Sequence, residues 1–289
     1  MNRRDFFRHA GTAAGTLALN AFPHHLFAAA TQKFAADRVK LGPMGVEVSR
    51  LAMGTGTNGV GGSSNQTRKL GLRGLAEMLC AAYDQGVTFF DSADQYGTHS
   101  HIKEALKGVP REKVQLLTKT RATTARQMRE DLDRYRSELG VDYIDIVLLH
   151  ALTDPDWNRK NRGAMDVLAE AREKKIIRAH GASCHSLAAL RTSALEPWLQ
   201  VQLARINPAR VAMDADVPAV VSALERIKAA GKGVIGMKIL GVGRLRKRAD
   251  ECLQFALAQS CVDCFTIGSE NRAEFEDLTR KIPPASVRG

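Results

Sequence analysis

The sequence predicts an α/β protein, a (β/α)8 TIM barrel preceded by a short N-terminal β-hairpin. Apolar runs typical of strands alternate with helical patterns eight times between residues 50 and 289. That length gives about 30 residues to each unit, which suits a strand followed by a crossover helix. The runs are continuously apolar, as expected for parallel strands that are buried on both faces. A doubly wound open sheet is the competing fold, and eight even units favour the barrel.

The predicted elements follow one another in a regular order. Residues 39–41 and 46–48 flank the turn Gly42-Pro43-Met44-Gly45 and predict the hairpin. The barrel strands are expected at 50–54, 87–90, 114–118, 144–149, 177–183, 199–206, 233–237 and 261–267. The helices are expected near 72–85, 100–107, 125–139, 163–174, 186–194, 217–230, 249–259 and 272–281. Apolar residues at helical spacing are clearest in 125–139.

The N-terminus carries Arg3-Arg4 followed by Phe6-Phe7 and Arg8. A mildly apolar stretch follows at 10–22, and residues 28–30 are the small residues that a signal peptidase needs. The stretch is too short and too weakly hydrophobic for a stable membrane span. The segment resembles a twin-arginine (Tat) export signal, which implies recognition by the Tat machinery and a periplasmic or other extracytoplasmic location. We expect a signal peptide at 1–30, a linker at 31–37 and the barrel at 38–289.

Composition excludes several classes of protein. Apolar residues make up 44% and charged residues 25% of the chain, which is typical of a globular domain and not of a disordered or fibrous one. The net charge of +11 would permit nucleic-acid binding. The basic residues are scattered and their richest stretches carry no aromatic residues, so we expect no nucleic-acid partner. A basic surface also suits an enzyme that takes an anionic cofactor or substrate.

The five cysteines leave one question open. Cys261-x-x-Cys264 could be a redox pair or half of a zinc site, but no further ligands follow at a suitable spacing. Two cysteines flanking the start of a core strand is the favoured interpretation, and whether they form a disulfide stays open. We expect no metal site.

A glycine-rich segment, Gly54-Thr55-Gly56-Thr57-Asn58-Gly59, follows the first barrel strand and matches G-x-G-x-x-G. A dinucleotide-binding fingerprint requires a helix to open at the third glycine. Here the helical pattern resumes only near Leu72, and no acidic residue ends a second strand about twenty residues later. We therefore interpret the segment as a mobile first loop at the mouth of the barrel.

Charged and polar groups end three consecutive predicted strands. Asp91 closes the second strand, with Tyr96 just beyond it; Lys119 ends the third strand and His150 the fourth. Barrels place their active sites at this end of the strands. A buried Asp beside a buried Lys would satisfy both charges. A nearby Lys also stabilises a phenolate and lowers the pKa of a Tyr, as a catalytic acid requires.

At these residues the chain resembles the aldo/keto reductase family. Asp91 and Tyr96 match F-D-[ST]-A-x-x-Y-G, Lys119 matches L-x-T-K, and His150 matches D-x-x-L-x-H. The resemblance covers roughly residues 38–289. It implies a metal-free carbonyl reductase that uses NADP(H) and works in both directions. Tyr96 would donate the proton, Asp91 and Lys119 would tune it, and His150 would orient the carbonyl.

The resemblance extends to cofactor-binding positions in the second half of the chain. Ser183 and Gln202 match residues that hold the carboxamide, while Cys184 replaces an asparagine. Further cofactor contacts are expected at Met237, Lys238, Leu240, Gly243, Gly268, Ser269 and Arg272. Glu274 and Asp277-Leu278 stand where the family usually has a further Arg and a Glu-Asn pair, so NAD(H) remains an alternative to NADP(H). No ferredoxin-like segment is indicated, so an iron–sulfur cluster is not expected.

The sequence therefore predicts an oxidoreductase that interconverts a small carbonyl compound and its alcohol. Trp157, in the loop after His150, could line the substrate pocket or merely anchor that loop. The rival hypothesis is a non-catalytic nicotinamide-nucleotide-binding regulator or sensor on the same barrel, which the altered Cys184 and Met237 positions and the predicted export motivate.

Overall fold

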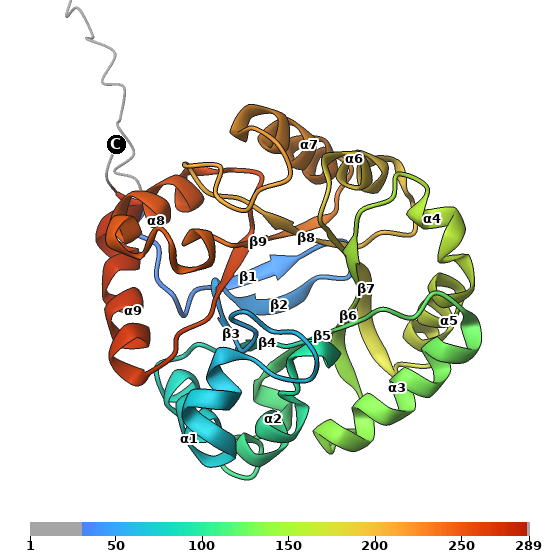
Figure 1. Cartoon of the computed structure of the whole chain (residues 1–289), viewed down its shortest axis with the longest axis horizontal. Coiled ribbons are helices and arrows are strands. Elements are labelled where there is room, and N and C mark those ends of the chain that lie inside the picture. Colours follow the sequence, from blue (N-terminus) through green and yellow to red (C-terminus); the bar gives the residue numbers. More distant parts are fainter. Residues whose placement is uncertain (1–30, 288–289) are drawn as a thin grey trace, which may run out of the picture. The chain divides into compact units, whose positions relative to one another are not determined.

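Eight parallel strands close into a barrel in the computed structural model, which describes residues 31–287 (Figure 1). Each strand pairs with its neighbour in chain order, and the last pairs with the first, Thr266 lying opposite Ala52. The predicted (β/α)8 barrel is therefore confirmed. The strands are β3 Leu51–Gly54, β4 Phe89–Asp91, β5 Gln115–Thr120, β6 Ile144–Leu152, β7 Ile177–Cys184, β8 Val201–Arg205, β9 Gly233–Met237 and β10 Cys264–Ile267.

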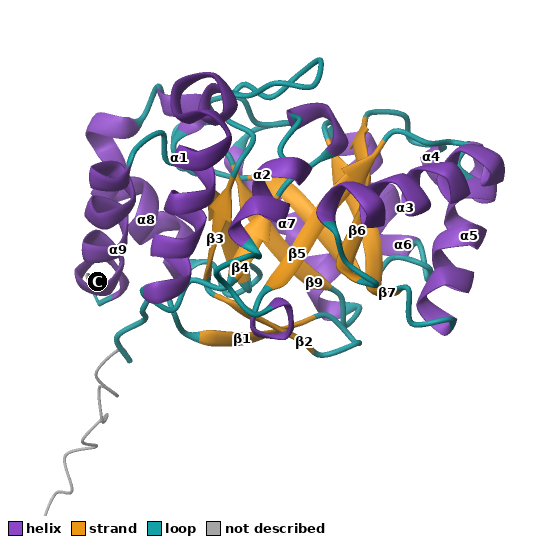
Figure 2. Ribbon diagram, turned by 90° about the horizontal axis from the view of Figure 1, so that it is seen from below, coloured by secondary structure: helices purple, strands orange, loops and turns teal. Residues whose placement is uncertain are grey.

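The predicted hairpin is also present and covers the N-terminal end of the barrel (Figure 2). Its strands β1 Arg38–Leu41 and β2 Val46–Ser49 pair antiparallel around a turn that begins at Gly42. Gly42 has φ +67°, and a Cβ there would lie 2.6 Å from the carbonyl oxygen of Gln200, so the turn lies directly against barrel backbone. Leu41 and Val48 join the inward-facing barrel residues in one apolar cluster. Ligands must therefore enter from the opposite end, where the strands finish.

Helices surround the barrel and bury the outward-facing strand residues (Figure 1). They are α1 Asn65–Asp84, α2 His99–Ala105, α3 Ala125–Leu139, α4 Trp157–Lys160, α5 Arg162–Glu173, α6 Leu187–Leu195, α7 Val217–Ala229, α8 Ala249–Ala258 and α9 Arg272–Ser286. Short 3-10 turns lie at η1 Asp94–Tyr96, η2 Arg111–Lys113, η3 Gly241–Gly243 and η4 Arg246–Arg248.

The start of α1 differs from the prediction. The helix begins at Asn65 rather than near Leu72, with Ser64 and Thr67 forming a capping box. Gly71 has φ +64° and interrupts the helix. The polar turns before Gly71 therefore do not share the apolar spacing of the residues after it, from which the helix was predicted. The loop after the glycine-rich segment is correspondingly shorter than expected.

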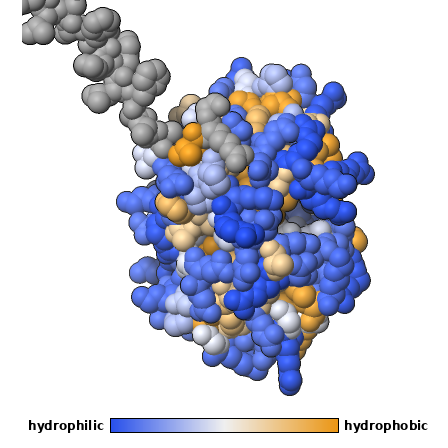
Figure 3. All heavy atoms as spheres, turned by 90° about the vertical axis from the view of Figure 1, so that its left-hand side faces the viewer, coloured by the Kyte–Doolittle hydropathy of each residue, from blue (hydrophilic) through white to orange (hydrophobic). Residues whose placement is uncertain are grey.

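The segment expected to be a linker contacts the barrel. The N–H of Leu51 donates to the carbonyl of Ala35 at 3.0 Å, Arg50 pairs with Asp37 at 3.1 Å, and Lys33 Nζ donates to the carbonyl of Leu257 at 2.6 Å. The expected export signal at 1–30 lies outside the described residues. Within 31–287, no helix is both long and apolar enough to cross a membrane. On the face shown in Figure 3, hydrophilic side chains predominate and hydrophobic ones lie in small groups.

Candidate active site

A buried ion pair joins β4 to β5 at the open end of the barrel. Lys119 is 1% exposed, and its ammonium donates to Asp91 Oδ1 at 2.5 Å and to the carbonyl of Ser92 at 2.6 Å. The other carboxylate oxygen of Asp91 accepts the hydroxyl of Thr266, on β10, at 2.8 Å. Burial lowers the pKa of Lys119, but Asp91 and Tyr96 together outweigh burial and raise it overall. Lys119 is therefore held as a cation inside the barrel.

Tyr96 lies over this pair at the end of the η1 turn. Lys119 Nζ is 4.9 Å from the centroid of its ring, and the His150 ring meets it edge-on with centroids 5.8 Å apart. Burial raises the pKa of Tyr96, and Lys119 offsets only part of that rise. The expectation that Lys119 lowers this pKa below its usual value is therefore corrected: Lys119 acts in that direction, but burial dominates.

The glycine-rich loop holds the Tyr96 ring in place. A Cβ at Gly56 would lie 2.1 Å from Tyr96 Cε2, and a Cβ at Gly59 would lie 2.3 Å from Tyr96 Cδ1. Both distances are far below van der Waals contact, so any larger residue at either position would have to displace the Tyr96 ring. The loop therefore forms one wall of the tyrosine site, which gives the motif a role other than the dinucleotide fingerprint rejected above.

An ion-pair network anchors the turn that carries Tyr96. Arg134, on α3, donates to Asp94 in η1 at 2.7 Å and also pairs with Asp131 and Glu138. His99 links Glu138 to Thr118 of β5, with both contacts at 2.7 Å. Sequence reasoning missed these residues, because their role depends on contacts between elements far apart in the chain.

His150, near the end of β6, is kept neutral. Burial and the charge of Lys119, followed by smaller effects of His185, Arg121 and Lys238, lower its pKa to about 2. Its Nδ1 atom is buried without a hydrogen-bond partner among the described residues. A neutral imidazole has one donor and one acceptor nitrogen. His150 can therefore offer an N–H to a ligand oxygen beside Tyr96.

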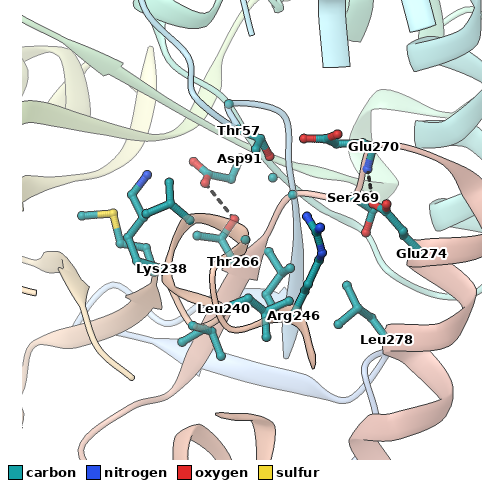
Figure 4. A pocket seen from close by; sticks show the side chains of 18 of the residues that line it. Thr57, Asp91, Lys238, Leu240, Arg246, Thr266, Ser269, Glu270, Glu274 and Leu278 are labelled. Carbon is teal, nitrogen blue, oxygen red and sulfur yellow. Dashed lines mark hydrogen bonds between the residues drawn. The ribbon is translucent and has the colours of Figure 1, made fainter. Parts of the chain in front are cut away.

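A cavity of about 260 Å³ extends from this cluster toward α9 (Figure 4). Asp91, Tyr96 and Lys119 line one end of it. Six of the predicted cofactor residues also line it, namely Met237, Lys238, Leu240, Gly243, Gly268 and Ser269. The Ser269 hydroxyl is buried without a hydrogen-bond partner among the described residues, so it can bond a ligand there. The cavity thus joins three of the four predicted catalytic residues to six of the nine predicted cofactor residues, while His150 contacts Tyr96 without lining the cavity.

Two further predicted cofactor residues lie beside this cavity without lining it. Ser183 and Gln202 are fully buried on the adjacent strands β7 and β8. The Ser183 hydroxyl has no partner among the described residues. The Gln202 amide donates to the carbonyl of Leu203 at 2.9 Å, and its oxygen accepts from Cys184 Sγ at 3.8 Å.

Arg272 and Trp157 do not take their predicted places. Arg272 does not line the cavity and pairs with Glu276 at 2.7 Å, one turn along α9. Trp157 is 1% exposed, and its indole N–H donates to the carbonyl of Ala189 at 3.1 Å. It is thus unavailable to a substrate, and the alternative interpretation as a loop anchor is the correct one.

The structure adds cavity residues that sequence reasoning did not assign. They are chiefly Thr57, Arg246, Thr266, Glu270, Glu274 and Asp277. Arg246 belongs to the basic stretch at 244–248, which composition alone suggested was ordinary surface charge. The cysteines at 261 and 264 are free thiols, and within 31–287 no group of three or more His, Cys, Asp or Glu residues could hold a metal ion.

Replacing Asp91 with Asn should destabilise the fold. Folding the variant would bury Lys119 unpaired or strip its proton, and breaking a buried pair can cost about 3–5 kcal/mol. Free Lys titrates near pH 10.4, so the deficit in unfolding free energy should be largest near pH 7 and shrink steadily as the pH rises toward and past pH 10. Urea unfolding at both pH values measures this.

Asp133→Asn is the matched control, because Asp133 pairs with Arg136 at an exposed site. It should change the unfolding free energy by less than about 1 kcal/mol at either pH. Equal stability of Asp91→Asn and the control would show that the Asp91–Lys119 pair does not stabilise the barrel.

Comparisons with known proteins agree with this geometry. The Aldo/keto reductase family profile matches residues 52–262. A Glycine max protein named "Probable aldo-keto reductase 1" is 31% identical over 57% of this chain and 50% of its own length. The NADH-specific methylglyoxal reductase of Escherichia coli K12 is 27% identical over 50% of this chain and 51% of its own. The chain thus spans about half the length of these curated relatives.

Solved structures share the fold at lower identity. A Pseudomonas aeruginosa structure assigned to the aldo-keto reductases superposes with a TM-score of 0.74 and 21% identity, over 88% of this chain and 97% of that one. At this identity the likeness establishes the barrel alone. The family profile covers most of the chain and includes Asp91, Tyr96, Lys119 and His150. The chain belongs to the aldo/keto reductase family.

Proposed function

We propose that this protein is an NAD(P)-dependent oxidoreductase that reduces an aldehyde or ketone to an alcohol, or catalyses the reverse reaction. The observation that carries the proposal is the buried Asp91–Lys119 pair beneath Tyr96, next to a neutral His150. A stable barrel has no need of a buried cation under a tyrosine. Such an arrangement is useful where a proton must move at one oxygen atom.

Each group has a distinct role in this reaction. The Tyr96 hydroxyl donates a proton to the carbonyl oxygen and regains it from the alcohol in the reverse direction. The Lys119 cation stabilises the phenolate that remains, and Asp91 keeps Lys119 charged and in position. The neutral His150 donates its N–H to the same carbonyl oxygen and orients it. A bound nicotinamide supplies or accepts the hydride at carbon.

The cavity residues fit a nicotinamide dinucleotide. The cavity is lined by Tyr96 and combines apolar side chains with glycines and the unpartnered Ser269 hydroxyl. A Cβ at Gly243 would have open space around it, so the backbone of η3 can be approached closely by a ligand. Met237, Lys238, Leu240, Gly243, Gly268 and Ser269 would hold the dinucleotide, and the unpartnered Ser183 hydroxyl is a further candidate contact at the reacting end.

A nucleotide-binding sensor is the second candidate function. The observation in its favour is that the Gln202 amide bonds to backbone and to Cys184 instead of facing the cavity. In that case the protein would bind the dinucleotide without turning over a carbonyl compound. The cluster around Tyr96 favours the catalytic proposal.

The proposal includes export by the Tat pathway. Arg3-Arg4, the weakly apolar stretch and the small residues at 28–30 support it. The Tat pathway carries folded proteins, so the barrel would acquire its nucleotide in the cytoplasm. The exported protein would then need to retain that nucleotide, either to couple an oxidation to a reduction or to act as a sensor.

Tyr96→Phe tests the catalytic proposal. The change removes only the proton donor, so nucleotide binding should persist while kcat for carbonyl reduction falls about 10²–10⁴-fold. Steady-state kinetics across a panel of aldehydes and ketones, with NADH and with NADPH, measures this. Undiminished activity in the variant would refute the role of Tyr96, and a wild type that binds nucleotide but reduces nothing would favour the sensor.

Gly56→Ala tests the packing of the loop against Tyr96. The added methyl group would overlap the ring, so the tyrosine must move, and a displacement of about 1 Å can cost about 10²-fold in rate. Gly108→Ala is the matched control, because its Cβ would meet nothing closer than 3.7 Å. We expect kcat to fall in the first variant and to stay unchanged in the second. A similar kcat in the two variants would show that the loop does not position Tyr96.

Replacing both Arg3 and Arg4 with Lys tests export. Wild type should be recovered outside the cytoplasm with residues 1–30 removed, and the double variant should be retained inside. Cell fractionation, with mass spectrometry of the mature N-terminus, measures both. Recovery of uncleaved wild type from the cytoplasm would refute the export proposal.

A further inference from the structure

The end of the cavity next to α9 is lined by carboxylates. Glu270 follows β10 and Glu274 lies on the first turn of α9, and both face the same space (Figure 4). Asp277, on the second turn of α9, also lines the cavity. If the nicotinamide lies at Tyr96, as the proposed function requires, this end receives the adenosine half of the dinucleotide. NADH and NADPH differ only here, because NADPH carries a phosphate on the adenosine ribose.

The start of α9 already holds its own anion. The Asn271 side chain accepts the N–H of Glu274 at 2.9 Å, and the Glu274 carboxylate accepts the N–H of Glu270 at 2.8 Å (Figure 4). Backbone N–H groups at a helix start are a common binding site for phosphate. Here an internal carboxylate takes the N–H of Glu270, which immediately precedes the N-cap of α9, so an incoming phosphate would meet a like charge.

Basic residues neutralise two of these three carboxylates, and Glu274 is the one that forms no ion pair among the described residues. Lys69 pairs with Glu270, Asp277 pairs with Arg280 and Lys281, and Arg272 pairs with Glu276 away from the cavity. Among the described residues that line this end, Arg246 is the one cation. Burial raises the pKa of Glu270, but its contacts with Asn65 and Lys69, with a smaller effect of Arg246, outweigh burial and lower it overall. The ion pairs therefore leave Glu274 as the carboxylate that an incoming phosphate would meet.

We propose that this acidic end makes the site selective for NADH over NADPH. Glu274 disfavours the ribose phosphate by charge repulsion and by occupying the N–H of Glu270. Carboxylates at this position can instead accept hydrogen bonds from the ribose hydroxyls, which NADH presents uncovered. This inference departs from the NADP(H) expected from family resemblance, and it rests on the proposed function only for the orientation of the dinucleotide.

Direct binding measurements test the selectivity without catalysis. Calorimetry on the purified full-length chain should give a Kd for NADH at least about tenfold below the Kd for NADPH. The ratio of the two Kd values should fall at high salt, because salt screens charge repulsion. ADP-ribose and its 2′-phosphate are probes that lack the nicotinamide and should show the same preference. An equal or lower Kd for NADPH in wild type would overturn the inference.

Two charge-neutralising variants on α9 assign the effect to one residue. Glu274→Gln keeps the size of the side chain, so it should tighten NADPH several-fold and change the Kd for NADH by less than about twofold. Glu276→Gln is the matched control, because Glu276 pairs with Arg272 and does not line the cavity. An unchanged NADH-to-NADPH ratio in Glu274→Gln, or an equal change in the control, would refute the role of Glu274.

Arg246→Gln distinguishes the opposite interpretation. If Arg246 binds the ribose phosphate, its loss should weaken the affinity for NADPH far more than the affinity for NADH, and this result would overturn the inference. If the inference holds, the variant should change the two affinities by a similar factor. Selective NADH binding without turnover of any carbonyl compound would refute the proposed catalysis and leave the inference standing. Binding of neither nucleotide would refute both.

Discussion

The site depends on keeping one buried ammonium group charged. Lys119 is satisfied by Asp91 and by the Ser92 carbonyl, and Asp91 in turn is satisfied by Thr266 from the last strand. Thr266 reaches Asp91 across β3 because the intervening residue is Gly54, whose Cβ would lie 2.9 Å from the Thr266 hydroxyl. The hydrogen bond from Thr266 therefore adds the last strand of the barrel to the ion pair that joins β4 and β5. Closure of the barrel completes the set of partners that satisfies the buried charges.

The tyrosine above this pair is placed by shape as well as by charge. Gly56 and Gly59 leave room for its ring, and the Asp94–Arg134 contact fixes the short turn on which it lies. The net pKa of Tyr96 is raised, which keeps the hydroxyl protonated at neutral pH. A protonated tyrosine beside a cation is the state needed to donate a proton to a carbonyl oxygen. Packing thus supplies the protonated donor, and Lys119 limits the cost of losing the proton.

The fold could be predicted because strand and helix patterns alternate regularly along the sequence. The site could be predicted only in part, because the sequence does not show which way a side chain points. Eight apolar runs gave the barrel, and strand-end residues gave Asp91, Lys119 and His150 in one place, because parallel strands all end at one face. Arg272 was misplaced because a helix-start arginine can turn toward a ligand or toward Glu276 four residues on, and sequence cannot choose between them. Trp157 was misplaced because a tryptophan in a loop anchors it as readily as it lines a pocket. The polar start of α1 lacked apolar periodicity and so resembled loop.

The charges along the cavity differ from one end to the other, and this difference bears on how a dinucleotide would lie. Lys238 lines the cavity on the side away from Glu270 and Glu274 (Figure 4), where burial, followed by Lys119 and Arg205, lowers its pKa. An anion bound beside Lys238 would act in the opposite direction and favour its charged form. In the proposed orientation, phosphate groups of the dinucleotide would favour the charged form of Lys238 if they came close to it, while the adenosine ribose would lie toward Glu270 and Glu274. A ribose phosphate would meet the Glu274 carboxylate there, so the proposed preference for NADH would follow from the same distribution of charge.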